Sequence, residues 1–227
     1  MNSEVQMVVF DMAGTTVDEG KIVYKSVQQA LAESGVTISL TQVLEIGGWN
    51  KKEGIRHLLN TYSPSEVSPE KVDQVHQRFL EIASAAYATG EGIQEMPGAT
   101  EVFRELKSRG IKVVLDTGYF RDMANVLIDH MGWKKHELID YSVTSDEVER
   151  GRPYPYMIQK AMEQLEVHDP AKVIKVGDTL SDIEEGKNAG CGWIIAIASG
   201  AISAEKLMEN KPTKVIHELK ELLELIN

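Results

Sequence analysis

Two segments of the chain place polar groups just after an apolar run, where they could act on a phosphoryl group. Asp11 follows the apolar residues 7–10, and its carboxylate could attack phosphorus and so divide one difficult displacement into two easier steps. Thr117 and Gly118 stand just beyond the apolar residues 113–115, where they offer a hydroxyl and a backbone N–H to phosphoryl oxygens. These residue types predict a nucleophile with hydrogen-bond donors for the group that it attacks.

Two further segments could supply the positive charge that such a displacement requires. Arg152 stands between a glycine and a proline, and its guanidinium could neutralise both the nucleophile and the transferred group. Asp178 and Asp182 follow the apolar residues 173–176, and carboxylate oxygens are ligands that Mg²⁺ prefers. We therefore expect Asp178 to bind Mg²⁺ together with one oxygen of Asp11, and Asp182 to be a direct or an outer ligand.

Each of these residues also has a purely structural interpretation. Asp11 could cap the helix that follows it, and Asp182 could be the acidic first-turn residue of its own helix. Arg152 could be an exposed cation in a turn, although Pro153 and Pro155 stiffen its surroundings. The order of all four segments along one chain, each after a predicted strand or turn, favours a shared site.

The elements that would position these residues alternate between apolar strands and amphipathic helices. Periodicity predicts strands at residues 7–10, 111–115, 141–143, 173–176 and 193–197. Helices are predicted at residues 100–108, 120–130, 156–165, 182–189, 204–209 and 217–226. This alternation indicates an α/β fold with a doubly wound parallel sheet, in which the carboxyl ends of the strands meet at one edge.

Residues 17–90 interrupt the alternation of strands and helices, because the whole segment is predicted to be helical. Apolar spacing predicts helices at residues 22–34, 41–46, 52–59 and 71–87. We therefore predict an α/β core domain formed by residues 1–16 and 91–227, with an inserted helical cap domain formed by residues 17–90. Glycine and proline punctuate the two crossings, at residues 14–17 and 96–98, which are the expected hinges.

The four segments in this order resemble the motifs of the haloacid dehalogenase superfamily. The closer resemblance is to its phosphonatase family, and it rests on Asp-Met-Ala-Gly-Thr-Thr-Val-Asp at residues 11–18, Thr-Gly-Tyr at residues 117–119, and residues 151–155 and 177–190. The resemblance implies a Rossmann-like core, an aspartyl-phosphate formed on Asp11, and the backbone carbonyl of Ala13 as a further Mg²⁺ ligand.

Ala13 is a departure from the pattern that the resemblance implies. The ordinary phosphomonoesterases of this superfamily have aspartate two residues after the nucleophile. That aspartate protonates the leaving alkoxide and later activates water, and alanine can do neither. A phosphonatase cleaves a P–C bond, so its leaving group is carbon and needs an electron sink instead. An imine between a lysine and the aldehyde of the substrate supplies that sink.

Lys51 is the lysine that the resemblance places at the imine position, in a glycine-containing loop at the start of a cap helix. A free lysine titrates near 10.4, so a reactive amine needs burial or a neighbouring cation, which Lys52 could supply. The alternative is that both lysines are solvated residues at a helix start. Two positions depart from the family: Lys21 and Gly54 stand where it has a cysteine and a histidine.

Composition limits the classes of partner. The 227 residues carry a formal net charge of −11, and the pI of about 5.1 argues against a nucleic-acid surface. No apolar run is long enough for a membrane span, and the first residues lack a signal-peptide pattern. Cys191 is the single cysteine, so we expect no internal disulfide and a cytoplasmic protein. The sequence is compatible with a homodimer.

Three functions remain in consideration from the sequence. The first is a Mg²⁺-dependent, phosphonatase-like hydrolase acting on phosphonoacetaldehyde or a related small phosphonate. The second is a phosphomonoesterase for a small phosphorylated metabolite such as phosphoglycolate, against which Ala13 counts. The third is a catalytically silent binding protein, which the joint presence of Asp11, Thr117, Arg152 and Asp178 disfavours.

Overall fold

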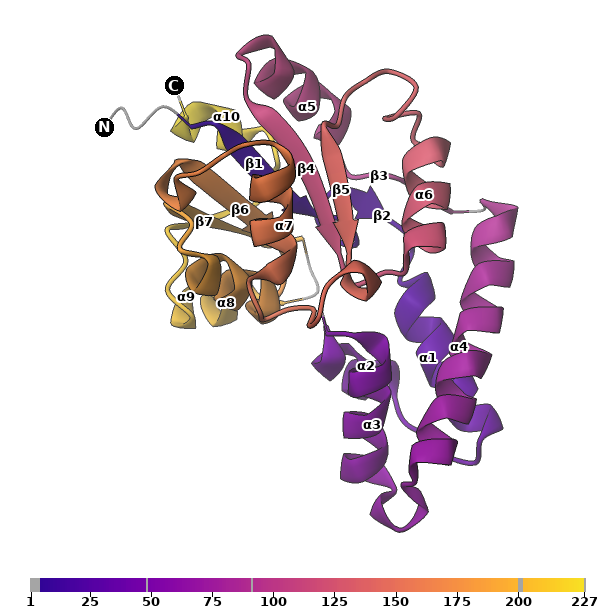
Figure 1. Ribbon diagram of the computed structural model, residues 1–227. Coiled ribbons are helices and arrows are strands. Elements are labelled where there is room, and N and C mark those ends of the chain that lie inside the picture. The colour runs from indigo at the N-terminus through magenta and orange to yellow at the C-terminus, as the bar shows by residue number, and fades with distance from the viewer. Residues whose placement is uncertain (1–4, 48, 91, 200–201, 227) are drawn as a thin grey trace.

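A six-stranded parallel sheet forms the centre of the molecule, and a group of helices projects from one side of it (Figure 1). The computed structural model describes residues 5–47, 49–90, 92–199 and 202–226, so Gly48 and the ends of the predicted core domain lie outside it. The strands are β1 (Met7–Asp11), β4 (Lys112–Thr117), β5 (Tyr141–Thr144), β6 (Val173–Gly177), β7 (Trp193–Ile197) and β8 (Lys214–Ile216). They lie in the order β5-β4-β1-β6-β7-β8, and every neighbouring pair is parallel.

Helices cover both faces of the sheet, because alternate side chains of each buried strand point to opposite faces. Val8 and Phe10 pack into one apolar cluster, whereas Met7 and Val9 pack into another on the opposite face. The first face carries α5 (Ala99–Ser108), α6 (Arg121–His130) and α10 (Glu221–Leu225). The second carries α7 (Tyr156–Gln164), α8 (Leu180–Ala189) and α9 (Ala204–Glu209). The doubly wound α/β fold is confirmed.

The inserted segment folds into the expected helical cap, with α1 (Ile22–Glu33), α2 (Leu40–Val43), α3 (Lys51–Tyr62) and α4 (Pro69–Thr89). In Figure 1 the cap helices lie beside one another below the core, and α4 packs against both α1 and α3. The apolar faces of these helices belong to the same continuous cluster as Val8 and Phe10. The cap therefore extends the apolar cluster of the first face, with α4 packed against the core helix α6, while domain boundaries near residues 16 and 90 stay a prediction.

Short elements differ from the sequence prediction. Residues 217–226 were expected to be one helix, but α10 spans only Glu221–Leu225, and an unexpected edge strand, β8, precedes it. Two residues of β2 (Val17–Asp18) pair antiparallel with two of β3 (Gln94–Glu95), where the sequence showed no strand. Strands of two or three residues are too short to carry a readable alternation. Within the part of the chain described, no helix is both long and apolar enough to cross a bilayer.

Hydrogen bonds fix both the first turn of α3 and the loop that precedes it. The Asn50 side chain accepts hydrogen bonds from the backbone N–H groups of Lys52, at 3.0 Å, and Glu53, at 3.3 Å, which satisfies orphan donors of the first turn. The hydroxyl of Ser181, on the core helix α8, donates to the Gly47 carbonyl at 3.2 Å. Lys51 therefore begins a capped helix whose preceding loop is hydrogen-bonded to the core.

Gly54 holds α3 against the 3₁₀ turn Leu44–Ile46, because a Cβ at Gly54 would lie 2.6 Å from Ile46 Cδ1 and 2.9 Å from Ile46 Cβ. Alanine in place of glycine inside a helix normally raises stability by about 0.5–1 kcal/mol. We expect Gly54→Ala to lower the free energy of unfolding instead, by about 1–3 kcal/mol, because the helix is overpacked. Urea unfolding measures this change.

The matched control is Asn60→Ala, an exposed position in the same helix. It should leave the unfolding midpoint unchanged or raise it. A Gly54→Ala variant as stable as the parent would show that α3 does not approach the Leu44–Ile46 turn as closely as described.

Candidate active site

Residues from the core and the cap line one pocket at the carboxyl edge of the sheet. The register pairs Asp11 with Asp116 across β1 and β4, so β1 ends beside the residue that precedes Thr117. The cavity volume of this pocket is only about 20 Å³, which is room for roughly one water molecule. Its lining is Asp11, Ala13, Val23, Tyr24, Lys51, Thr117, Gly118, Tyr119, Arg152 and Thr179. We call it the nucleophile pocket.

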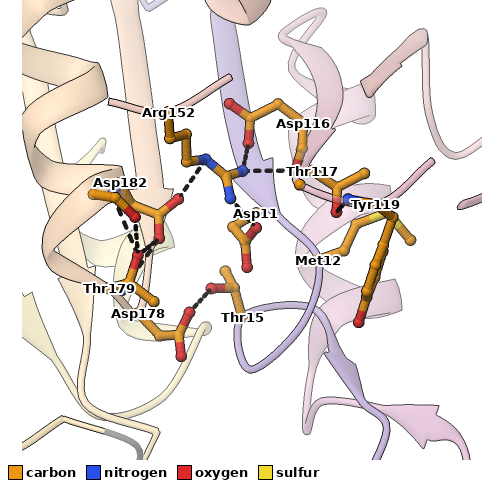
Figure 2. A network of polar contacts seen from close by, with 12 residues as sticks. Asp11, Met12, Thr15, Asp116, Thr117, Tyr119, Arg152, Asp178, Thr179 and Asp182 are labelled. Atoms are coloured by element: carbon orange, nitrogen blue, oxygen red, sulfur yellow. Dashed lines mark hydrogen bonds and ion pairs between the residues drawn. The ribbon is translucent and has the colours of Figure 1, made fainter. Parts of the chain in front are cut away.

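Arg152 lies buried at the centre of the polar network that Figure 2 shows. Its Nη1 is 2.7 Å from Asp11 Oδ1, and its Nη2 ion-pairs with Asp116 and donates to the Asp116 carbonyl at 2.9 Å. Its Nε lies 3.0 Å from Asp182 Oδ1 and 2.9 Å from Glu185 Oε2. The exposed-turn interpretation of Arg152 is wrong, since its side chain is only 1% exposed.

Lys175 brings a second buried cation into this network from the middle of β6. Its Nζ ion-pairs with Asp116 and lies 3.0 Å from Glu185 Oε2 and 3.2 Å from Asp182 Oδ1. Burial and the charge of Asp116 raise the pKa of Glu185 to about 8, so this carboxyl is protonated at neutral pH. The cluster of Arg152 and Lys175 with these acids holds the guanidinium in one place.

Asp11 is placed and charged as a nucleophile must be. It is 4% exposed, and burial raises its pKa to about 6 while Arg152 opposes the rise. The carboxylate is therefore mostly ionised at neutral pH, and an ionised carboxylate is the nucleophilic form. Thr16 donates its hydroxyl to the Asp11 carbonyl at 2.9 Å, which fixes the end of β1.

Asp178 is buried beside this network but pairs with none of its cations. Among the described residues its side chain accepts one hydrogen bond from another side chain, from Thr15 Oγ1 at 3.3 Å, and forms no ion pair (Figure 2). Burial and the charges of Asp11 and Asp182 raise its pKa well above the usual range. A buried carboxylate in this state fits a site for a divalent cation.

The backbone comes unusually close to Asp178 at Gly14. Gly14 has φ of +83°, and a Cβ there would lie 2.4 Å from Asp178 Oδ2. Only glycine allows this conformation at such a distance. The loop after Asp11 is thereby held against Asp178, and the preceding residue Ala13 lines both the nucleophile pocket and the neighbouring pocket that Asp178 lines.

A second group of acids also gathers ligand atoms. One oxygen each from Asp11, Asp116 and Asp182 lie within 4.8 Å of one another. Arg152 and Lys175 already neutralise these oxygens, which makes this cluster an ion-pair network first. Asp182 also accepts from the backbone N–H of Thr179 at 3.2 Å, in a capping box at the start of α8, so its structural interpretation holds alongside its place at the site.

Thr117 and Gly118 lie at the end of β4, in the turn that borders the nucleophile pocket. Thr117 is 3% exposed, and its Oγ1 accepts from the backbone N–H of Tyr119 at 3.2 Å, which leaves the hydroxyl proton available. The Gly118 carbonyl accepts from Ser145 Oγ at 3.1 Å, which fixes this turn. Both residues line the nucleophile pocket with Asp11 and Arg152.

Lys51 extends from the cap into the same pocket. It is only 6% exposed, and its Nζ donates to the Trp49 carbonyl at 2.8 Å and lies 5.7 Å from the centre of the Tyr24 ring. Burial, together with the charge of Arg152, lowers its pKa to about 8. The solvated interpretation of Lys51 is therefore wrong, whereas Lys52 lies partly exposed in an ion pair with Asp73 at 2.5 Å.

Several site residues carry no role in the sequence analysis. Lys175 was detectable, because a lysine inside an apolar strand requires a buried partner. Asp116 and Tyr119 stood within a motif but had no assigned role. Nothing in the sequence marked Glu19 and Tyr24, since their proximity to Lys51 depends on how the cap packs.

Known proteins similar to this chain identify its family. The sequence profile of the haloacid dehalogenase-like hydrolases matches residues 5–190. A phosphonoacetaldehyde hydrolase of Bacillus cereus (strain G9842) is 30% identical over 98% of this chain and 87% of its own length. A bifunctional phosphonoacetaldehyde hydrolase/aminoethylphosphonate transaminase of Clostridioides difficile (strain 630) is 31% identical over 99% of this chain, which spans 36% of that longer protein.

Solved structures share the fold over nearly the whole chain. A phosphonoacetaldehyde hydrolase-like protein from Oleispira antarctica superposes with a TM-score of 0.85 at 27% identity, covering 98% of this chain and 91% of its own. A putative phosphoglycolate phosphatase from Lactobacillus delbrueckii subsp. bulgaricus has a TM-score of 0.84 at 18% identity, covering 98% of both chains. The second similarity shows the fold alone.

Removing Asp116 should deprive two buried cations of one of the acids that they share. We expect Asp116→Ala to lower the free energy of unfolding by about 3–5 kcal/mol, the range for breaking a buried ion pair on one side. Urea unfolding at neutral pH measures the loss. Glu101→Ala, which breaks an exposed pair with Lys220, is the control and should leave stability essentially unchanged. Equal effects of the two variants would contradict the network.

Proposed function

Because the chain belongs to the haloacid dehalogenase-like hydrolases, we propose that it is a Mg²⁺-dependent, phosphonatase-like hydrolase. It would release phosphate from phosphonoacetaldehyde or a related small phosphonate through an aspartyl-phosphate on Asp11. The observation that carries this proposal is the pairing of Ala13 with the buried Lys51 in the pocket that Asp11 lines. That pocket has an amine for an aldehyde but no acid at the ester-cleaving position.

The core side of the pocket supports the phosphoryl step. The Asp11 carboxylate would attack phosphorus, and the P–C bond would break as the Asp11 O–P bond forms. Arg152, 2.7 Å from Asp11, would draw the phosphonate oxygens toward the nucleophile and offset the added negative charge. The Thr117 hydroxyl and the Gly118 N–H would hold the remaining oxygens, because both line the same pocket.

The acidic side of the site supports a bound Mg²⁺. Asp11 and Asp178 would hold it with the carbonyl of Ala13, while Asp182, paired with Arg152 and Lys175, would orient the guanidinium from outside the ligand set. When bound, the ion would supply the positive charge that lets two anions approach. The buried Asp178 carboxylate, unpaired with any described cation, supports this assignment.

The cap side of the pocket supports the electron sink. Lys51, with a pKa lowered to about 8, keeps a usable fraction of free amine at neutral pH. That amine would form an imine with the aldehyde carbon of the substrate. As the P–C bond breaks, its electron pair would move into the carbon chain and on to the imine nitrogen. Val23 and Tyr24 close this part of the pocket with apolar surface.

A comparison of two substrates tests the function. We expect phosphate release from phosphonoacetaldehyde with Mg²⁺, none with excess EDTA, and much slower release from phosphoglycolate. Asp11→Asn should abolish the phosphonate reaction, because an amide is a poor nucleophile. Ala13→Asp should raise the ester rate, since a general acid contributes roughly 10²–10⁴-fold. Parent activity on the ester that exceeds activity on the phosphonate would favour a phosphomonoesterase instead.

Lys51 should react as a buried amine with a lowered pKa. We expect acetylation of Lys51, followed by mass spectrometry over pH 6–10, to reach half its maximal rate near pH 8, because the free amine forms as pH rises through the lowered pKa of about 8. An ordinary lysine would reach that point near pH 10.4. Phosphonoacetaldehyde with cyanoborohydride should also leave a reduced adduct on Lys51.

Lys51→Arg is the matched variant for this test, because it keeps the positive charge but forms no imine. It should lose the adduct and the phosphonate reaction while retaining the unfolding midpoint. Lys52→Arg, on the next residue, should retain both. A Lys51→Arg variant with near-parent turnover would show that Lys51 acts through its charge alone.

A further inference from the structure

Glu19 is a buried carboxyl group that the reaction outlined above does not use. It follows β2 at the entry to the cap and is 3% exposed. Tyr87, from the cap helix α4, donates its hydroxyl to Glu19 Oε2, and Tyr119, from the core, also hydrogen-bonds to the carboxyl. The Tyr87 and Tyr119 hydroxyls lie 3.3 Å apart. The three groups form a connected chain from the cap to the core.

Tyr119 connects this chain to the nucleophile pocket. It lines that pocket together with Lys51 and Asp11, whereas Glu19 lines the neighbouring pocket with Ala13 and Asp178. Tyr24 lines both pockets. Tyr119 therefore borders this pocket and also hydrogen-bonds to the buried carboxyl of Glu19.

The charges around Glu19 suit proton exchange with Lys51. Burial raises the pKa of Glu19 to about 7, while the two tyrosines, the Val23 backbone and the positive charge of Lys51 oppose the rise. In turn, burial lowers the pKa of Lys51 to about 8, and the negative charge of Glu19 opposes this decrease. An acid and a base whose pKa values both lie near the working pH exchange protons most effectively.

We propose that Glu19 is the acid–base residue for imine chemistry at Lys51 and that it moves protons through the Tyr119 hydroxyl. This inference rests on the proposed function, because it requires an aldehyde substrate. Glu19 acts through Tyr119 and does not itself touch the substrate. The alternative is that Glu19 only holds the cap against the core through Tyr87. That role would require its hydrogen bonds but no exchange of its proton.

Imine formation needs only the aldehyde, Lys51, Tyr119 and Glu19. The Lys51 amine adds to the aldehyde carbon, the C=O pair moves to oxygen, and a proton passes from nitrogen to that oxygen, giving a carbinolamine. Tyr119 gives its proton to the carbinolamine hydroxyl and takes the Glu19 proton in turn. The C–O bond breaks, water leaves, and the nitrogen lone pair forms the protonated imine. P–C cleavage leaves an enamine on Lys51, which takes a proton from water on its terminal carbon and becomes the product imine. Hydrolysis of that imine reverses the transfers above and returns the proton to Glu19.

The initial rate of Lys51 adduct formation tests this proposal. With phosphonoacetaldehyde and cyanoborohydride, we expect a bell-shaped pH profile in the parent, because the rate needs both the free Lys51 amine and the Glu19 acid. Glu19→Gln should slow adduct formation by roughly 10²–10⁴-fold. It should also remove the fall on the alkaline side, since glutamine has no proton to lose. A merely structural role for Glu19 would leave the shape of the profile unchanged.

Controls separate this proposal from the function on which it rests. Glu53→Gln, which changes an exposed carboxyl two residues from Lys51, should match the parent. If Glu19→Gln does not fold, Tyr119→Phe tests the same proton path and should give the same change of profile. A parent that forms no adduct overturns the proposed function. An adduct whose rate and pH profile survive both Glu19→Gln and Tyr119→Phe overturns only the role of Glu19.

Discussion

The site depends on one buried guanidinium. Arg152 contacts four acids from three segments of the chain, so the ends of β1 and β4 and the start of α8 are held at fixed distances from one another. Such a group is costly to bury unless its hydrogen bonds and charges are matched. The acids Asp116 and Asp182 supply that match, and each of them also pairs with Lys175. The geometry around Asp11 is therefore set before any substrate binds.

The two sides of the nucleophile pocket divide the proposed chemistry between two parts of the fold. Strand ends of the core supply the nucleophile and the phosphoryl contacts, while α1 and α3 of the cap supply Tyr24 and Lys51. The hydrogen bond from Ser181 to the Gly47 carbonyl joins these parts beside the pocket. Substrate chemistry can therefore differ among such proteins through the cap alone, while the phosphoryl side stays the same.

Sequence patterns predicted the parts of this molecule that local physics determines. Buried strands and their terminal Asp11, Thr117 and Asp178 were readable, because apolar runs and strand ends are local features. The partners of Arg152 were not, since Asp116 and Glu185 look like any other acids until packing brings them together. The same holds for Glu19, whose burial depends on the distant residues Tyr87 and Tyr119. The short strands β2, β3 and β8 owe their pairing to tertiary context.

The small β2–β3 pair governs how the cap can move. Both crossings between core and cap pass through it, with Val17 opposite Glu95 and Asp18 opposite Gln94. A further backbone hydrogen bond joins Met96 N–H to the Thr16 carbonyl at 2.9 Å. Because the two crossings are hydrogen-bonded to each other, they cannot bend independently. Any displacement of the cap from the core must therefore move both crossings together, so the position of Lys51 over the pocket depends on four paired residues.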